Sequence, residues 1–263
     1  MAKIESYKPG SFVWSELASS DPEAAKKFYG SMFGWTSVDM QTPAGVYTIF
    51  QSEGNETAAL YHAPPGMPPN WGVYFSAPEL DETSSKIAGL GGEIVMGPGD
   101  VGPAGRMTVA KDPLGVHFSL WQAKEKIGAT HGGPLGQVVW PELATPDPEG
   151  AVKFYGSLLG WKTKPETGLD TAQYAEWVNY GQSIGGILPM RGDMWAGVPP
   201  HWMIYITVAD CDERASHAAS LGAKIHVPPR DIPNTGRFSM IQDPQGAMFS
   251  IIHLTGMHQP ASA

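Results

Sequence analysis

A long internal repeat constrains the fold of this chain more than any other feature. The stretch from Val138 to Trp161 (VVWPELATPDPEGAVKFYGSLLGW) repeats the stretch from Phe12 to Trp35 (FVWSELASSDPEAAKKFYGSMFGW). The copies lie about 126 residues apart, and a match of this length at one offset indicates a duplicated structural unit. The 263-residue chain is therefore predicted to fold as two similar halves.

Each copy of the repeat predicts a strand, a turn and a helix. In the first copy, residues 12–18 predict the strand. Asp21 followed by Pro22 is typical of a helix start, with an acidic N-cap and proline at the first helical position. Apolar residues then recur at helical spacing, and Gly34 ends the helix. The second copy carries the same signals.

The turns that follow are repeated as well. Segment 66–71 (GMPPNW) is matched by 197–202 (GVPPHW), and the turn 112–115 (DPLG) is matched by 243–246 (DPQG). Strand and helix candidates lie between these turns in the same order in both halves. Each half is therefore predicted to contain two units, each of one strand, one helix and three further strands.

A polar segment separates the two halves. Residues 123–136 (AKEKIGATHGGPLG) are rich in glycine and charge, which is typical of a linker. We therefore expect a first domain at 1–122, a linker at 123–136 and a second domain at 137–263. Because duplication within one chain can replace a dimer of single domains, either a monomer or a homodimer is expected.

Charge and composition argue against several kinds of partner. The net charge is −9 and no run of Lys or Arg occurs, which argues against nucleic acid and against an anionic membrane surface. No apolar run is long enough to span a membrane, and residues 1–8 lack the apolar core of a signal peptide. The single cysteine, Cys211, permits no internal disulfide and fits a reducing compartment. A cytoplasmic protein is expected.

The order of these motifs resembles a known superfamily. A strand, Asp-Pro, a helix ending in Phe-Tyr-x-x-x-x-Gly-Trp, and later Asp-Pro-x-Gly before a last strand are similar to the vicinal-oxygen-chelate superfamily. That group includes glyoxalase I, bleomycin- and fosfomycin-resistance proteins and extradiol dioxygenases. The resemblance covers residues 11–253. It implies an α+β fold of two tandem glyoxalase-like barrels, built from four βαβββ modules.

The resemblance also implies a divalent metal on the inner face of a barrel, but the ligand positions do not carry metal ligands. Superfamily enzymes use His, Gln or Glu at these places, where an N/O ligand set leaves vacant sites for a Lewis-acid role. The matching positions here are Trp14, Trp140, Gly72, Met203, Ser119 and Ser250. No metal ligand and no cofactor are therefore predicted, and a divalent metal at a shifted site is kept as an alternative.

Strand alternation indicates which side chains line the two inner faces, because residues two apart in a strand share a face. Both faces are predicted to be aromatic, with one carboxylate and one histidine. Such a mixture suits a flat, partly apolar small molecule held by a few polar groups. The predicted ligand-binding residues are Trp14, Tyr74, His117, Trp121, Trp140 and Tyr205.

Three residues are candidates for catalysis. Glu16 and Glu142 occupy the same place in the two repeats, and each is either a base or a carboxylate that holds strands in register through hydrogen bonds. Glu142 with His201 is the best pair for proton transfer or for a shifted metal site.

Three functions of different class remain open. The first is a glyoxalase- or bleomycin-resistance-like protein that binds a small aromatic or carbonyl-bearing compound in the barrel pockets. The second is a lyase, isomerase or oxygenase-type enzyme that uses Glu142 or Glu16 as a base. The third is structural, with one barrel serving mainly to pack against the other.

Overall fold

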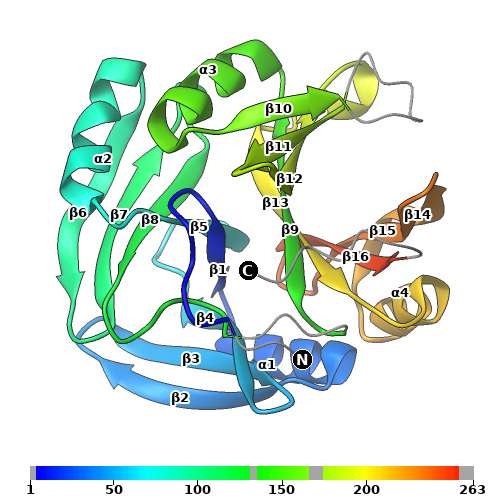
Figure 1. The fold of residues 1–263 in the computed structure, drawn as a ribbon. Coiled ribbons are helices and arrows are strands. Elements are labelled where there is room, and N and C mark those ends of the chain that lie inside the picture. Colours follow the sequence, from blue (N-terminus) through cyan, green and yellow to red (C-terminus); the bar gives the residue numbers. More distant parts are fainter. Residues whose placement is uncertain (1–3, 131–134, 166–173, 255–263) are drawn as a thin grey trace.

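The computed structural model describes residues 4–130, 135–165 and 174–254. Each half forms one mixed sheet of eight strands, and Figure 1 shows both sheets curled, with helices packed against them. The predicted α+β fold of four βαβββ modules is confirmed. The division into domains 1–122 and 137–263 with a linker at 123–136 stays a prediction.

The first half contains two modules in succession. Its elements are β1 (Phe12–Ser19), α1 (Pro22–Phe33), β2 (Thr36–Thr42), β3 (Gly45–Ser52), β4 (Asn55–His62), β5 (Asn70–Ser76), α2 (Leu80–Lys86), the 3₁₀ helix η1 (Ala88–Leu90), β6 (Glu93–Val101), β7 (Gly105–Lys111) and β8 (His117–Ala123). The strand order in its sheet is β2-β3-β4-β1-β5-β8-β7-β6. The first strands of the two modules, β1 and β5, therefore pair at the centre.

The second half repeats this topology. Its elements are β9 (Val138–Thr145), α3 (Pro148–Leu159), β10 (Lys162–Pro165), β11 (Ala175–Asn179), β12 (Gln182–Pro189), the 3₁₀ helix η2 (Asp193–Trp195), β13 (His201–Thr207), α4 (Cys211–Ser220), β14 (Lys224–Ile232), β15 (Gly236–Gln242) and β16 (Met248–Leu254). The strand order is β10-β11-β12-β9-β13-β16-β15-β14, so β9 and β13 are the central pair.

The helix signals of the repeat act as predicted. The Asp21 carboxylate accepts a hydrogen bond from the Ala24 amide at 3.0 Å, which satisfies a free donor of the first turn. Gly34 closes the helix with φ of 68°, a conformation that glycine adopts at low cost. The second helix of the first half is short, because after α2 the chain tightens into the 3₁₀ turn η1 before Gly91.

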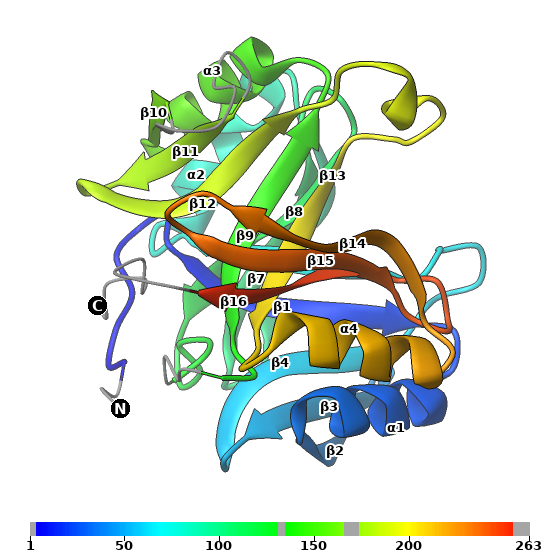
Figure 2. The same cartoon turned by 90° about the vertical axis from the view of Figure 1, so that its right-hand side faces the viewer.

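The outer faces of the two sheets share one core, since the first helix of each half packs against the other half. Tyr29 on α1 lies 5.5 Å, between ring centroids, from Phe249 on β16. Tyr155 on α3 lies 5.5 Å from Phe118 on β8 in the same way. Figure 2 shows α1 beside α4, and Ser31 on α1 is hydrogen-bonded to His217 on α4 at 3.0 Å.

Tryptophan side chains join the halves in a reciprocal pattern. The Trp35 indole donates to the carbonyl of Gly136, which precedes β9, at 2.8 Å. The Trp161 indole donates to the carbonyl of Gly10, which precedes β1, at 2.9 Å. Each half therefore anchors the chain where the other half begins, and the motif Gly-Trp after the helix serves both the local turn and the contact between halves.

Candidate functional site

A half-buried network of four side chains lies on the inner face of the first sheet, opposite the face that packs on α1. Glu16 on β1 accepts hydrogen bonds from two tyrosine hydroxyls, Tyr47 on β3 at 2.9 Å and Tyr74 on β5. The Trp14 indole donates to the hydroxyl of Tyr47 at 3.2 Å. The central carboxylate is thus held by three strands, and we call this set the first Glu–Tyr cluster.

The second sheet carries the same arrangement. Glu142 on β9 accepts from Tyr174, just before β11, at 2.9 Å and from Tyr205 on β13 at 3.0 Å. The Trp140 indole donates to the hydroxyl of Tyr174 at 3.2 Å. This second Glu–Tyr cluster shows that the arrangement belongs to the repeat and does not depend on one local contact.

Sheet register explains why these residues meet. Trp14 lies opposite Tyr74 across the central strands, and Tyr74 lies opposite Ser119 on β8. Directly paired residues share a face, so this row runs across three strands on the inner side. In the second half the matching row is Trp140, Tyr205 and Ser250.

Burial changes the proton affinities of the carboxyl and hydroxyl groups in the first cluster. Burial raises the pKa of Glu16 above its ordinary value of 4.5, and the hydrogen bonds from Tyr74 and Tyr47 oppose part of that rise. Burial raises the pKa of Tyr47 and of Tyr74 well above 10.0, and the nearby Glu16 charge adds to the increase. The tyrosines therefore remain protonated donors at neutral pH.

The structure brings some of the predicted site residues together and separates others. Glu142 lies with Trp140 and Tyr205, whereas His201 is paired across the sheet with Ala144, two positions along β9. The His201 Nδ1 is 2.9 Å from the Pro199 carbonyl. The geometry thus gives Glu142 tyrosine partners, and the predicted pairing of Glu142 with His201 stays a prediction.

The two remaining predicted ligand-binding residues of the first half lie on β8. His117 is exposed and is paired across the sheet with Lys111, at one end of the strand. Trp121 is half-buried, and its indole donates to the Lys126 carbonyl at 2.7 Å. Both share the inner face with Ser119 but lie along β8 on either side of it.

Sequence reasoning missed Tyr47 and Tyr174, which complete the two clusters. Each follows its glutamate by nearly the same distance, 31 residues in the first half and 32 in the second. That repeated spacing is the signal that was available. It was obscured because the segment between the helix and this strand is poorly matched between the repeats.

The side chains present do not fit the divalent metal that the resemblance implies. The positions matching the superfamily ligands carry Trp, Gly, Met and Ser. Across 4–130, 135–165 and 174–254, no group of three or more His, Cys, Asp or Glu could hold a metal ion. Glu16 offers one carboxylate, and its tyrosine neighbours stay protonated, which makes them poor ligands. We therefore derive no step through a metal.

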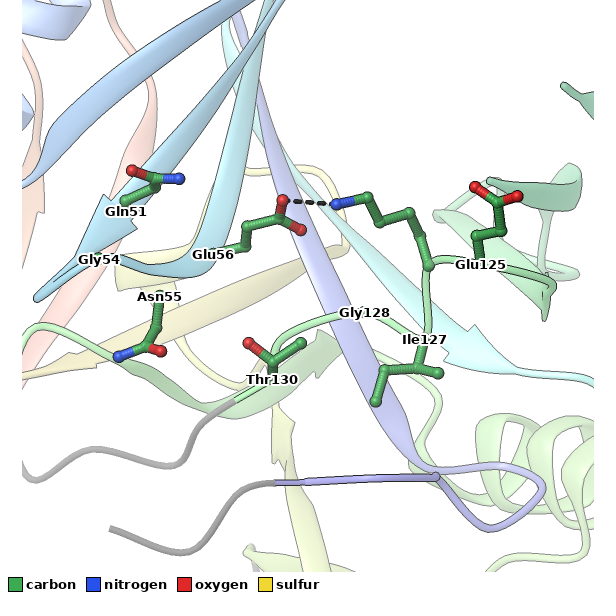
Figure 3. Close-up of a pocket in the computed structure, with 9 residues that line it drawn as sticks. Gln51, Gly54, Asn55, Glu56, Glu125, Ile127, Gly128 and Thr130 are labelled. Carbon is green, nitrogen blue, oxygen red and sulfur yellow. Dashed lines mark hydrogen bonds and ion pairs between the residues drawn. The ribbon is translucent and has the colours of Figure 1, made fainter. Parts of the chain in front are cut away.

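A separate cavity of about 290 Å³ lies where the segment after β8 crosses the start of β4 (Figure 3). Lys126 and Glu56 form an ion pair across it at 2.6 Å. The cavity is lined by Gln51, Gly54, Asn55, Glu56, Glu125, Lys126, Ile127, Gly128 and Thr130. It shares no lining residue with either Glu–Tyr cluster.

Membrane insertion through a helix has no support in the described part of the chain. None of its helices is both long and apolar enough to cross a bilayer.

Sequence comparison identifies relatives over nearly the whole chain. Residues 11–120 and 135–251 match the family model described as the Glyoxalase/Bleomycin resistance protein/Dioxygenase superfamily. The chain is 38% identical over 261 residues to "Putative glyoxylase CFP32" of Mycobacterium bovis, covering 96% of this chain and 98% of that protein. It is 36% identical over 268 residues to "Anthracycline biosynthesis protein DnrV" of Streptomyces peucetius, covering 94% of each.

Comparison with solved structures shows the same fold at low sequence identity. The Mn(II)-bound glyoxalase from Novosphingobium aromaticivorans superposes with a TM-score of 0.66 at 18% identity, over 96% of this chain and 86% of that one. The homoprotocatechuate 2,3-dioxygenase from Arthrobacter globiformis gives 0.66 at 16% identity, over 99% of this chain and 84% of that one. The duplicated βαβββ topology, the repeated motifs and the family match together show that this chain belongs to the glyoxalase/bleomycin resistance protein/dioxygenase superfamily.

Proposed function

We propose that this protein binds a flat, partly aromatic small molecule on the inner face of a sheet, with a Glu–Tyr cluster as the polar anchor. The observation that carries this proposal is the duplicated cluster itself, in which Trp14 and Tyr47 lie half-buried beside a half-buried carboxylate. Aromatic walls with a few convergent polar groups are typical of small-molecule sites.

The hydrogen bonds already made within the first cluster indicate which polar groups a ligand should carry. Both tyrosine hydroxyls donate their protons to Glu16, and Tyr47 already accepts from Trp14. The capacity left for a ligand is therefore mainly the remaining lone pairs of the carboxylate and hydroxyl oxygens. Such a site favours a ligand that donates, for example through a phenolic hydroxyl, and that offers an aromatic face to the tryptophan.

The names of two relatives support this class of ligand. DnrV and a second protein of 34% identity, DauV of Streptomyces sp. (strain C5), are both named anthracycline biosynthesis proteins. We infer that a flat, hydroxylated polycyclic ketone suits the inner face of this chain. 1,4-Dihydroxyanthraquinone is a simple probe, because it is flat and carries both phenolic donors and carbonyl oxygens.

Titration of tryptophan fluorescence with this probe tests the proposal. We expect saturable quenching in the wild type, because Trp14 and Trp140 belong to the two clusters. The double variant Glu16→Gln, Glu142→Gln is expected to weaken binding at least tenfold, because an amide donates where the ligand also donates. Glu149→Gln, an exposed glutamate on α3, is the matched control. Equal binding by the double variant and the control would contradict the anchor role.

A second function, acid–base catalysis by Glu16, has one observation in its favour. Burial raises the pKa of Glu16, which brings a carboxylate closer to the range in which a general base works. In this reaction Glu16 would remove a proton next to a carbonyl group of the bound compound, as in a lyase or isomerase. Turnover that is lost in Glu16→Gln while probe binding persists would favour catalysis over binding alone.

A further inference from the structure

We propose that the first half is the ligand-accepting half, and that Met203 fills the corresponding place in the second half. The residue facing each glutamate across the central strand pair, Gly72 or Met203, would then decide which cluster can be reached. This inference rests on the proposed binding function and names the half that performs it.

The two positions are equivalent in the sheet. Glu16 lies opposite Gly72 across β1 and β5, and Glu142 lies opposite Met203 across β9 and β13. Directly opposed residues of an antiparallel pair have neighbouring side chains on the same face. Whatever occupies this position therefore lies directly beside the carboxylate that anchors the cluster.

In the first half this place is open. A Cβ atom built at Gly72 would meet only Glu16, with the Glu16 Cγ at 3.8 Å and the Glu16 carbonyl oxygen at 3.7 Å. Glu16 is itself half-buried, as are Trp14 and Tyr47 beside it. The missing side chain thus leaves room next to Glu16, among residues that are only half-buried.

In the second half a side chain occupies the same place. Met203 is 3% exposed, and its sulfur accepts a hydrogen bond from the Ser250 hydroxyl at 3.0 Å. Glu142 is 5% exposed. The thioether therefore reaches from β13 to β16 beside the second cluster, in the space that Gly72 leaves open beside the first.

The strands on the other side of each glutamate also differ between the halves, and this difference again favours a ligand in the first half. In the first half, Ala59 on β4 pairs with both Glu16 and Ile49. In the second half, Gly186 on β12 pairs with both Glu142 and Glu176. The first inner face therefore has an apolar side chain, that of Ile49, where the second has another buried carboxylate.

That second carboxylate is already bound within the protein. Glu176 accepts from Ser183 and lies 3.0 Å from Lys164 in an ion pair. Only the carboxylate of this pair is buried, since the Lys164 side chain is 53% exposed. An aromatic ring gains more from contact with an isoleucine than from contact with a buried carboxylate, because a carboxylate that loses its polar partners is costly to bury. Both differences direct a flat ligand to the first half.

Exchange of the two residues tests the inference with 1,4-dihydroxyanthraquinone as the probe. Binding stoichiometry and affinity are measured by tryptophan quenching and equilibrium dialysis. We expect one probe per chain in the wild type, loss of affinity by at least tenfold in Gly72→Met, and two probes per chain in Met203→Gly. Because glycine weakens a strand, Met203→Ala serves as the second variant, and circular dichroism confirms that each variant is folded.

The outcomes separate the two proposals. Wild-type binding that survives in Gly72→Met but is lost in Met203→Ala would assign the ligand to the second half and overturn this inference alone. Two probes per wild-type chain would also overturn it, while leaving the binding function intact. No binding by the wild type would instead contradict the proposed function, and it would also contradict the assignment of the ligand site to the first half.

Discussion

At the scale of single residues, the first Glu–Tyr cluster shows how neutral donors can hold a half-buried carboxylate. Glu16 accepts from Tyr47 and Tyr74, and these neutral donors replace part of the hydration that burial removes. The compensation is incomplete, because the pKa of Glu16 is still raised above 4.5 by burial. The folded state therefore binds the Glu16 proton more tightly than the unfolded chain does, and stability becomes linked to pH.

We expect Glu16→Gln to gain stability relative to the wild type as pH rises. Since the folded-state pKa of Glu16 lies above 4.5, its stabilising contribution is complete below pH 4.5 and is lost as pH rises through the folded-state value. The glutamine of the variant does not titrate. The difference in free energy of unfolding between the variant and the wild type should therefore change as pH rises from 4.5 through the folded-state pKa of Glu16, and then level off. Urea unfolding at a series of pH values measures it, with Glu149→Gln correcting for one lost charge. A difference independent of pH would contradict the raised pKa.

At the scale of elements, the Phe-Tyr motif of α1 does more than fill a local core. Tyr29 donates from α1 to the Asp243 carboxylate in the second half at 2.9 Å, and it accepts from the Trp71 indole at 3.0 Å. Asp243 also accepts from backbone amides of its own turn, including that of Ala247 at 2.9 Å. Three motifs recognised separately in the sequence thus form one buried hydrogen-bonded chain.

Tyr29→Phe is expected to destabilise the protein by about 1–3 kcal/mol, because it leaves buried groups of Trp71 and Asp243 without their partner. Tyr155→Phe should have the same direction and a smaller effect, since its bond to Asp112 is longer, at 3.3 Å. Tyr180→Phe, at a position 62% exposed, is the matched control. Chemical denaturation measures all three variants. Equal stability of Tyr29→Phe and the control would show that these hydrogen bonds of Tyr29 contribute nothing to the free energy of unfolding.

At the scale of the whole molecule, the two halves are separate as sheets but joined as a core. α1 contacts β16 and α4 of the second half, and α3 contacts β8 and α2 of the first. The repeat that identifies two halves in the sequence therefore also supplies the contacts that fasten them together. This arrangement resembles an isologous interface between two copies, now enclosed within one chain.

Much of the fold could be predicted because its signals are local. The helix start at Asp21, the helix end at Gly34 and the turn after Lys111 depend on residues a few positions apart. The glutamates and tryptophans of the inner faces followed from strand alternation, which is also local. The ends of short elements such as α2 cannot be predicted in this way, because single turns depend on packing more than on pattern.

The sequence by itself determined the duplication, the four modules, the inner-face positions of Glu16 and Glu142 and the absence of the superfamily's usual ligand types at the matching positions. Only the tertiary structure decided that Tyr47 and Tyr174 complete the clusters, and that Met203 stands where Gly72 leaves room. The physical reason is separation along the chain. Register between strands, and contact between halves, join residues tens to hundreds of positions apart, and no local pattern encodes which of them meet.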